Sequence, residues 1–351
     1  MKLLIYADPH WSSYSSIVRS RGEKYSIRLE NLIKTMNWIE SEAQKQNCDH
    51  IVCLGDYFDK SELNSEEVTA LQEINWSNLE HWFIVGNHEM GRSNLEHSSS
   101  HLFQLLPNAN VIDYIFVSSE GDTSIVMLPY ILENNRTSLK EYLEPYRNQL
   151  AENIIILSHN DIAGIQMGNF LSTTGFTIEE IEENCNLFIN GHLHNESDIG
   201  TKIINLGNIT GQNFSEDAFR YSHKAAILDT VEKSLIYIEN PYAMNFYKVT
   251  LNHMDALQDE KLIKATLAVL KYPAVATIRI DAKQGDIVKN ILATCDNIIE
   301  HRIIVDGVAE NKSITITNEV TLDHIQKFQM YVMENIGKDE LTLNELERVS
   351  K

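Results

Sequence analysis

The sequence predicts an α/β fold, and two observations support that class. Five short apolar runs each end in a group of polar residues, and several of the segments between them have helical periodicity. An uninterrupted apolar run is typical of a strand that is buried on both faces, as in parallel sheets. In open α/β sheets the binding site lies beyond the carboxyl ends of the strands, where these polar groups stand.

The apolar runs and the polar groups alternate in a fixed order along the chain. The runs cover residues 3–7, 51–54, 82–85, 154–157 and 187–189. The groups that close them are Asp8-Pro9-His10, Gly55-Asp56, Gly86-Asn87-His88-Glu89, Ser158-His159 and Gly191-His192-Leu193-His194. A single Gly-Asp or Gly-His pair arises by chance in a chain of this length, whereas five such groups at strand ends indicate one shared site.

The segments between the runs are predicted to supply helices and further strands. Apolar residues at helical spacing predict a helix over 25–46, and shorter helices are predicted over 136–150 and 177–184. A second segment with an apolar pattern lies near 66–76. Residues 200–237 are predicted to form strands and turns, with strands at 203–206 and 225–229.

Asn240-Pro241 is predicted to separate two domains. Residues 1–240 hold all five polar groups. Residues 241–318 alternate predicted helices (257–270 and 286–295) with predicted strands (274–280 and 302–305), which indicates a small α+β cap domain. Residues 319–351 are expected to form C-terminal helices. Residues 322–336 place apolar side chains on one helical face, which either packs on its own domain or docks a partner.

The composition limits the partners and the location of the protein. With a formal net charge of −21, the chain gains little from general attraction to phosphate, so DNA binding would need a basic patch, bound metal ions or a partner. One basic cluster follows the first polar group and consists of Arg19, Arg21, Lys24 and Arg28. It is either the solvated start of a helix or a weak DNA-binding site.

We expect no membrane span and a cytoplasmic location. No stretch of the sequence approaches the ~20 apolar residues that a span requires. A signal peptide would have to be cut through the first polar group. The four cysteines have neither close pairing nor Cys-x-x-Cys spacing, so buried reduced thiols are expected rather than disulfides or a zinc knuckle.

The polar groups together offer carboxylate, amide and imidazole ligands, which suit borderline divalent ions such as Mn²⁺, Fe²⁺ or Zn²⁺. Because the groups contain no thiolate, a closed structural zinc site is not expected. Seven ligand side chains are too many for one ion and suit two ions that share a carboxylate. Two ions ~3.5–4 Å apart can polarise a phosphate, activate a water molecule and orient in-line attack. The sequence therefore favours two-metal phosphoester hydrolysis.

The series of polar groups resembles that of the calcineurin-like metallophosphoesterases. Within them it is most similar to the SbcD-type nucleases of double-strand-break repair, including short phage versions. The resemblance covers roughly residues 1–240 through these motifs, and the tract 206–216 is similar to a Gly-Ser…Phe-x-Glu stretch of those nucleases. It implies a two-sheet sandwich flanked by helices, followed by the cap and the C-terminal helices.

The resemblance also implies an activity and partners. The activity would be 3′→5′ exonuclease action on duplex DNA ends and endonuclease action on single strands, with two Mn²⁺ ions. The partner would be an SbcC-type ABC ATPase, and the nuclease would be a homodimer acting in DNA end processing, recombination and repair. The location would be the host cytoplasm if the source is viral.

The site residues are assigned by the same resemblance. Asp8, His10, Asp56 and His194 would hold one ion. Asp56, Asn87, His159 and His192 would hold the other, so that Asp56 bridges the pair. His88 would not bind metal but would stabilise or protonate the leaving oxygen. Other histidines, such as His50, His81, His97, His101 and His223, are expected to be structural or exposed.

Two departures from the nuclease pattern keep an alternative open. Glu89 and the series Gly55-Asp56-Tyr57-Phe58-Asp59 resemble the protein Ser/Thr phosphatases, so a metallophosphatase or a nucleotide phosphodiesterase is the second hypothesis. However, Lys60 and Val85 replace two arginines that grip a dianionic monoester in those phosphatases, which favours diesters. A scaffold that has lost its chemistry is a third hypothesis, and the complete ligand set argues against it.

Overall fold

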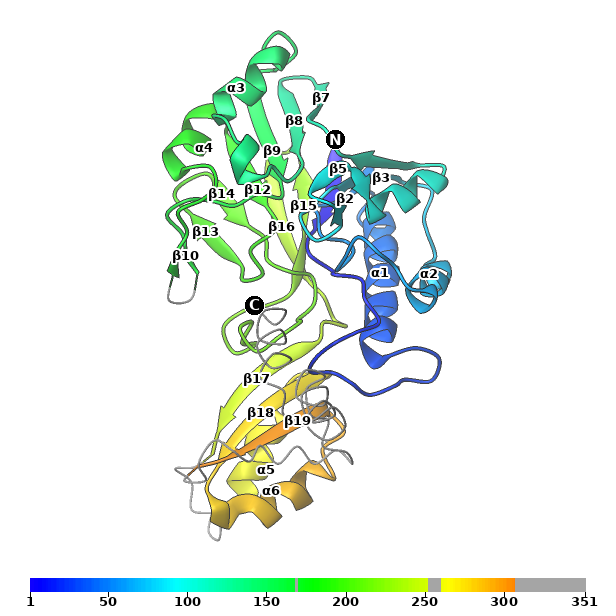
Figure 1. Ribbon diagram of the computed structural model, residues 1–351, viewed down its shortest axis with the longest axis vertical. Coiled ribbons are helices and arrows are strands. Elements are labelled where there is room, and N and C mark those ends of the chain that lie inside the picture. Colours follow the sequence, from blue (N-terminus) through cyan, green and yellow to red (C-terminus); the bar gives the residue numbers. More distant parts are fainter. Residues whose placement is uncertain (168–169, 252–259, 307–351) are drawn as a thin grey trace, which may run out of the picture.

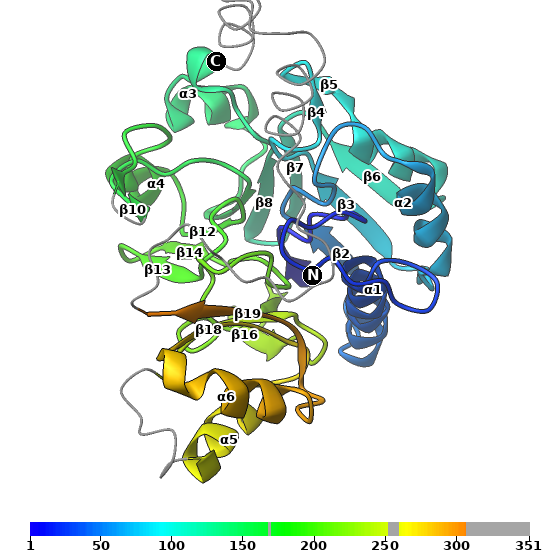
Figure 2. The same ribbon diagram turned by 60° about the horizontal axis from the view of Figure 1, so that its bottom comes forward.

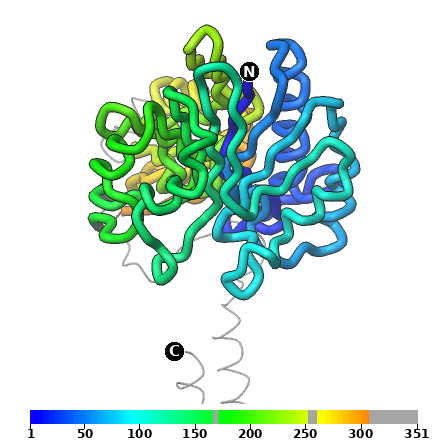
Figure 3. Tube along the Cα trace, turned by 90° about the horizontal axis from the view of Figure 1, so that it is seen from above, coloured from blue at the N-terminus to red at the C-terminus, as the bar shows by residue number. Residues whose placement is uncertain are grey.

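The chain folds into two six-stranded sheets that pack face to face, with helices on both outer faces (Figure 1, Figure 2). This computed structural model describes residues 1–167, 170–251 and 260–306. Seen from above, residues from the first third of the chain make one half of the sandwich and residues from the middle make the other (Figure 3). The two-sheet α/β sandwich predicted from the sequence is therefore confirmed.

The first sheet has four parallel strands and two antiparallel strands at one edge. In spatial order it consists of β16 (Ser234–Glu239), β15 (Lys224–Asp229), β1 (Lys2–Tyr6), β2 (His50–Cys53), β3 (Glu80–Ile84) and β6 (Ala109–Ile112). The strands β1, β2, β3 and β6 run in one direction, so the loops that leave β1, β2 and β3 lie at the same edge.

The second sheet repeats this plan with an antiparallel strand at each edge. In spatial order it consists of β13 (Ser197–Ile199), β14 (Ile203–Asn205), β12 (Leu187–Asn190), β9 (Asn153–Ser158), β8 (Thr123–Leu128) and β7 (Phe116–Glu120). No element is predicted from the sequence over residues 90–128. Strands β6, β7 and β8, which complete both sheets, were therefore missed, because short strands without clear alternation give a weak periodic signal.

Apolar side chains from both sheets fill the space between them. Leu3 and Ile5 of β1, Val52 of β2, Met127 of β8 and Leu157 of β9 belong to one buried cluster. Since the opposite faces of these strands are covered by helices, each run is apolar on both sides. This core holds the carboxyl ends of β1, β2, β9 and β12 close to one another.

Helices cover the outer faces of the sandwich. The first sheet is covered by α1 (Ile27–Lys45), with the short α2 (Ser65–Ala70) nearby, and the second by α3 (Leu139–Leu143) and α4 (Ile178–Asn184). Helix α1 begins at Ser26, whose hydroxyl accepts a hydrogen bond from the backbone N–H of Leu29. It ends before Asn47, which adopts a left-handed conformation (φ 54°).

The predicted helix over 136–150 is wrong in its extent. The structure has only α3 followed by a 3₁₀ turn at Glu144–Tyr146. Pro145 lacks the backbone N–H that would donate to the Glu141 carbonyl, and its ring crowds that carbonyl, so the α-helix cannot continue. Two further hairpins leave the sheets, formed by β4 (Met90–Gly91) with β5 (Asn94–Ser98) and by β10 (Gln166–Met167) with β11 (Phe170–Leu171).

A separate three-stranded parallel sheet follows the sandwich and lies below it in Figure 1. It consists of β17 (Asn245–Thr250), β18 (Ala274–Ile280) and β19 (Ile298–Val305), with α5 (Glu260–Ala268) and α6 (Gly285–Leu292) between the strands. This unit has its own apolar core. The domain boundary at residue 240 falls between β16 and β17 and stays a prediction.

The three-stranded unit contacts the sandwich through a small apolar cluster. Val18, from the loop after β1, packs with Met244, Phe246 and Val275. The predicted C-terminal helices of residues 319–351, including the amphipathic segment 322–336, lie outside the described residues, as do residues 307–318 of the predicted cap. Within the described ranges, no helix is both long enough and apolar enough to cross a membrane.

Candidate metal centre

The five polar groups meet where the carboxyl ends of both sheets face each other. Among the residues that the structure describes, three sets of donor side chains could hold a metal ion. They are Asp8 with His10 and His194, His10 with Asp56 and His88, and Asp56 with His159 and His192; within each set the donor atoms lie within 4.8 Å of one another. All of these residues come from the predicted polar groups. Their roles as ligands stay predictions.

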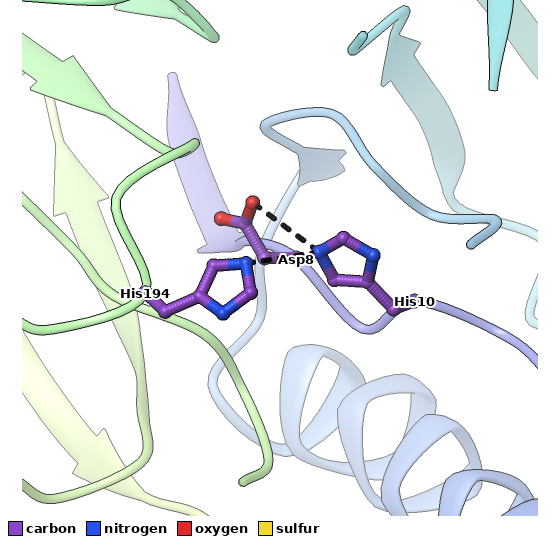
Figure 4. A group of neighbouring side chains, drawn as sticks. All are labelled: Asp8, His10 and His194. Carbon is purple, nitrogen blue, oxygen red and sulfur yellow. Dashed lines mark hydrogen bonds and ion pairs between the residues drawn. The ribbon is translucent and has the colours of Figure 1, made fainter. Parts of the chain in front are cut away.

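In the first set, two imidazoles from different sheets face each other. His10 follows β1 and His194 follows β12, and their rings lie on either side of Asp8 (Figure 4). Their Nε2 atoms are 3.2 Å apart, and His10 Nε2 is 3.9 Å from Asp8 Oδ1 and 3.8 Å from Asp56 Oδ2. Asp56 is thus within reach of both the first and the last set.

In the last set, Asp56 from the first sheet meets two histidines from the second. His159 Nε2 lies 3.2 Å from Asp56 Oδ2 and 3.1 Å from Asn87 Oδ1. His192 Nδ1 lies 3.3 Å from His159 Nε2. Asp56 therefore lies close to donors of both groups, and its role as a bridging carboxylate stays a prediction.

Four of the donor residues have a left-handed backbone, although none is glycine. Asp8, His10, Asp56 and His192 have φ values of 52°, 47°, 48° and 72°. Such conformations disfavour side chains with a Cβ atom and persist where the surrounding structure imposes them. Here the backbone is held by bonds between loops, since the N–H of His10 donates to the Asp56 carbonyl and the N–H of His192 donates to the Asp8 carboxylate.

Two glycines in the motifs are required by close approach. A Cβ atom on Gly86 would lie 2.3 Å from Asp56 Oδ1 and 2.5 Å from the Asp56 nitrogen. Gly55 has a φ of +100°, and its Cβ would lie 2.4 Å from His159 Nδ1. Only glycine lets these turns approach the donor side chains, which explains why Gly precedes the donor residue in both motifs.

The outer ring nitrogens of three histidines are fixed by oxygen acceptors. His10 Nδ1 is 3.2 Å from Asp59 Oδ1, His194 Nδ1 is 2.9 Å from Glu216 Oε1, and His159 Nδ1 is 2.7 Å from the Leu54 carbonyl. Because carbonyl and ionised carboxylate oxygens only accept, each Nδ1 carries the hydrogen. In the neutral ring each Nε2 then presents a lone pair toward the centre, as a metal ligand does.

The charges at the centre favour a bound cation. Burial alone lowers the pKa of the His159 imidazole, but the adjacent Asp56 carboxylate raises it to about 9. Burial alone raises the pKa of Asp56, but His159 and then His10 hold it well below its usual value. In the metal-free protein a proton on His159 thus offsets the negative charge of Asp56.

The donor set fits two divalent cations. Lone pairs that face each other at 3.2 Å, as in His10 and His194, repel unless a proton or a cation lies between them. The donors are carboxylate, amide and imidazole, which are ligands for borderline divalent metals. Asp56 lies close to donors of both groups, so one carboxylate can serve both ions.

His88 lies at the rim of the centre, with its side chain 44% exposed. Its backbone N–H donates to Asp56 Oδ1 (2.8 Å), and its Nδ1 lies 3.1 Å from the carbonyl of Asp59. The ring packs edge-on against His10, with 4.6 Å between centroids. Because Nδ1 is engaged by an acceptor, Nε2 is the atom that remains for a substrate.

Glu89 supports the turn that carries Asn87 and His88. It is fully buried and accepts hydrogen bonds from the backbone N–H groups of Gly86 (2.8 Å) and Phe58 (3.2 Å). Burial, followed by the negative charge of Asp56, raises the pKa of Glu89 to about 7. The glutamate therefore ties the third motif to the second.

The predicted basic cluster does not form one continuous surface. Arg28 is buried and donates to the His10 carbonyl (3.0 Å), so it supports the first motif from within. Arg21 pairs with Glu66 (2.7 Å), Lys24 with Glu73, and Arg19 Nε donates to the Ser16 carbonyl. A DNA-binding role for the cluster stays a prediction.

Histidines outside the motifs have structural partners. His81 pairs with buried Glu40 (2.9 Å), His101 with Asp113 (3.0 Å), and His223 lies 3.0 Å from the Asn208 carbonyl. His50 stacks on Trp82, and His97 is exposed. Of the described histidines, none of these five belongs to the three donor sets.

The carboxylates that hold the histidines were not predicted from the sequence as partners of those rings. Asp59 and Asp161 come three residues after Asp56 and two after His159, so a search for acids just beyond each motif would have found them. No local pattern pointed to Glu216, apart from the similarity of the tract 206–216 to a stretch of the SbcD-type nucleases. Its carboxylate reaches His194 because the segment that follows β14 folds back over the site.

Residues 1–196 match the family model described as calcineurin-like phosphoesterase. A comparison with curated proteins finds no match. Among solved structures, the chain is similar to TT1561 of Thermus thermophilus, with 10% identity, 68% of this chain and 98% of that chain covered, and a TM-score of 0.41. The chain is also similar to a dimetal phosphatase from Danio rerio, LOC 393393, with 13% identity. The similarity covers 68% of this chain and 95% of that chain, with a TM-score of 0.43. YfkN, a calcineurin-like phosphoesterase from Bacillus subtilis, is 10% identical. The similarity covers 68% of this chain and 88% of that chain, with a TM-score of 0.37.

Proposed function

Because the chain belongs to the calcineurin-like phosphoesterase family, whose members hydrolyse phosphoesters with two divalent metal ions, we propose that it is a Mn²⁺-dependent DNA nuclease of the SbcD type. Its substrate would be a phosphodiester, cut from the 3′ ends of duplex DNA and within single strands. The observation that carries the preference for diesters is the environment of Lys60.

Lys60 stands where the Ser/Thr phosphatases have an arginine that grips a dianionic monoester. Its Nζ lies 3.4 Å from the Oε1 of Glu67, whose side chain is fully buried. The ammonium is thus neutralised by a fixed carboxylate. Val85, at the second arginine position, is buried and has no charge. Both positions therefore favour a substrate phosphate with one negative charge, which is a diester.

We assign Asp8, His10, Asp56 and His194 to one ion, and Asp56, Asn87, His159 and His192 to the other. Two ions held in this way would polarise the phosphate, lower the pKa of a bound water molecule and orient it for in-line attack. The protein supplies fixed ligands, because the imidazoles are oriented by outer hydrogen bonds and the carboxylates by backbone N–H groups.

His88 is the proposed proton donor. Its Nδ1 hydrogen is donated to the Asp59 carbonyl, so in the protonated ring Nε2 holds the proton that can pass to the leaving oxygen. The ring is exposed at the rim, where a substrate phosphate can reach it.

The remaining assignments extend the proposal to partners and location. We propose that residues 241–318 form a cap that contacts DNA, and that residues 319–351 dock an SbcC-type ABC ATPase. The nuclease would be a homodimer in the cytoplasm of its cell or viral host. Since the net charge is −21, the isolated protein should bind DNA weakly, and the partner would supply much of the affinity.

A metallophosphatase or nucleotide phosphodiesterase is the second candidate. Two observations favour it: Asp59 contacts both His10 and His88, and Glu89 closes the third motif as in the Ser/Thr phosphatases. Both features orient the histidines whatever the substrate. The choice therefore depends on which esters the protein cleaves.

The first test uses 3′-labelled duplex DNA with Mn²⁺, compared with Mg²⁺. Metal-dependent release of nucleotides from the 3′ end is expected. His88→Ala should lower the rate by about 10²–10⁴-fold while both ions stay bound, because His88 donates a proton rather than a ligand atom. The matched control is His97→Ala, an exposed histidine outside the donor sets, which should keep the wild-type rate.

The second test compares a bis-aryl phosphate diester with the aryl phosphate monoester. Faster turnover of the diester is expected. Faster turnover of the monoester would overturn the nuclease proposal in favour of the phosphatase. Loss of metal from His88→Ala, measured by elemental analysis, would instead contradict the role given to that residue.

A further inference from the structure

One of the four proposed histidine ligands is turned the other way. His10, His159 and His194 point Nε2 toward the centre and fix Nδ1 on an outer oxygen. In His192 the inner atom is Nδ1, 3.3 Å from His159 Nε2, and the outer atom is Nε2, 3.0 Å from Asp161 Oδ1. This ring can act as a ligand only if Nδ1 is free of hydrogen.

Asp161 is itself held from its other oxygen. The Tyr130 hydroxyl donates to Asp161 Oδ2 (3.3 Å), and Arg136 Nη2 lies 3.8 Å from the same atom. The Arg136 guanidinium is fixed in turn, because Nη2 donates to the Ile131 carbonyl (2.7 Å) and Nη1 to Asn160 Oδ1 (3.3 Å). Tyr130, Asp161 and His192 follow the adjacent parallel strands β8, β9 and β12, so one sheet edge positions all three.

We propose that Asp161 is a positioning residue that selects the Nε2–H form of His192 and so leaves Nδ1 as the ligand atom for the second ion. This inference rests on the proposed two-ion site. The ionised carboxylate can only accept, so the hydrogen of the neutral ring must lie on Nε2. In the neutral form that binds metal, His159 Nε2 is also free of hydrogen, because its Nδ1 donates to the Leu54 carbonyl. Both lone pairs are then available to one cation.

The substitution Asp161→Asn should reverse the tautomer. Arg136 can only donate, so the amide oxygen takes the position of Oδ2, and the amide NH₂ group then faces His192 Nε2. That donor favours a hydrogen on Nδ1 instead. Nδ1–H would donate to Nε2 of the neutral His159 ring, 3.3 Å away, and both nitrogens would be withdrawn from the ion.

The test is a titration of the metal-free protein with Mn²⁺. Calorimetry measures the binding of the ions, and electron paramagnetic resonance detects whether they are spin-coupled. The wild type is expected to take up two ions with a spin-coupled signal. Asp161→Asn should bind one ion with wild-type affinity and the other about 10–100-fold more weakly, giving an uncoupled signal that becomes coupled at excess Mn²⁺. Activity should recover at the same excess.

Two further variants separate this role from a general effect of charge or folding. Asp198→Asn removes a carboxylate from exposed β13 of the same sheet and should leave both affinities unchanged. Tyr130→Phe removes the hydroxyl that holds Asp161 and should weaken the same ion to a smaller extent. The melting temperature of each metal-free variant shows whether it folds.

Nuclear magnetic resonance of the histidine side-chain nitrogens reports the tautomer without any metal. His192, assigned by its absence in His192→Gln, should carry its hydrogen on Nε2 in the wild type and on Nδ1 in Asp161→Asn. An unchanged tautomer, or two tightly bound ions in Asp161→Asn, would overturn the positioning role. A wild type that binds no second ion would instead contradict the proposed function.

Discussion

Single hydrogen bonds orient the histidine rings of the candidate metal centre, as in His10, His159 and His194. Each ring has an inner nitrogen among the donors and an outer nitrogen on a protein oxygen. The outer contacts fix the tautomer and the ring plane, so little orientation remains to be lost when an ion binds. Arg28 adds a bond to the carbonyl of His10 from the interior, which steadies the left-handed backbone of that residue.

Asp56 is the residue whose loss should affect both ions. Asp56→Asn keeps the shape of the side chain and an acceptor for the N–H of His88, but removes the shared negative charge. We expect the affinity for both ions to fall by about 100-fold or more. Calorimetric titration with Mn²⁺ measures both steps.

Asp8→Asn is the matched comparison, because Asp8 belongs to only one of the proposed ligand groups. It should weaken one ion and spare the other. A variant Asp56→Asn that binds either ion with wild-type affinity would show that the carboxylate does not bridge.

At the scale of elements, strand ends and glycine turns bring the donor side chains together. The loops after β1 and β2 run side by side, with the N–H of Trp11 donating to the Tyr57 carbonyl (2.6 Å). The turn after β3 approaches Asp56 so closely that only glycine fits at position 86. The positions of the donor side chains are therefore set by the packing of these turns against one another.

Gly86→Ala should destabilise the protein even without metal. The added Cβ would clash with both the side chain and the backbone nitrogen of Asp56, and such overpacking costs about 1–3 kcal/mol. Urea unfolding in the presence of chelator measures this change. Gly285→Ala, at the start of α6 with open space around it, is the control and should be neutral or slightly stabilising. Equal unfolding midpoints for the two variants would contradict the close approach.

His223, which precedes β15, should make stability depend on pH. Burial lowers the pKa of His223 below its usual value, against the opposing hydrogen bond with Asn208. The unfolded chain then binds a proton that the folded chain does not. The contribution of neutral His223 to the free energy of unfolding is fully present above about pH 6.5. It is lost as the pH falls below that value, by up to about 1.4 kcal/mol per pH unit.

Replacing His223 by Gln removes this proton uptake. The free energy of unfolding of His223→Gln should therefore fall less steeply than that of the wild type between pH 7 and pH 5. Denaturant titrations of metal-free protein at several pH values give both slopes. Identical slopes would mean that the buried ring does not titrate with unfolding.

At the scale of the whole molecule, the centre joins the two sheets. Asp8, His10 and Asp56 come from the first sheet, and His159 and His194 from the second. The three-stranded unit reaches the same region, since the N–H of Ala218, two residues after Glu216, donates to the Phe246 carbonyl of β17 (2.8 Å). Ions bound here would fasten the halves of the sandwich to each other.

Removing the ions should therefore lower the stability of the entire fold. A ligand present at 100 times its dissociation constant stabilises the folded state by about 2.7 kcal/mol. We expect a chelator to lower the melting temperature of the metal-loaded wild type, and added Mn²⁺ to restore it. The variant Asp56→Asn should melt at the same temperature with and without chelator. A wild type that is insensitive to chelator would argue against ions between the sheets.

The sequence by itself determined the α/β class and the donors that meet at the centre. Both depend on local patterns: apolar runs need burial on two faces, and polar groups at strand ends collect at one sheet edge. The sequence also indicated α1 through helical spacing and α4 as a short helix. It overestimated the helix over 136–150, where Pro145 acts against the periodicity.

Only the tertiary structure decided which residues orient those donors. Asp161, Tyr130 and Arg136 meet His192 because β8, β9 and β12 are neighbours, and neighbouring strands cannot be read from spacing along the chain. Glu216 reaches His194 through a segment that folds back from β14. Burial of Arg28 likewise depends on what packs around α1. Hydrogen bonds between distant segments arise from packing, so their partners are fixed by the fold and not by local sequence.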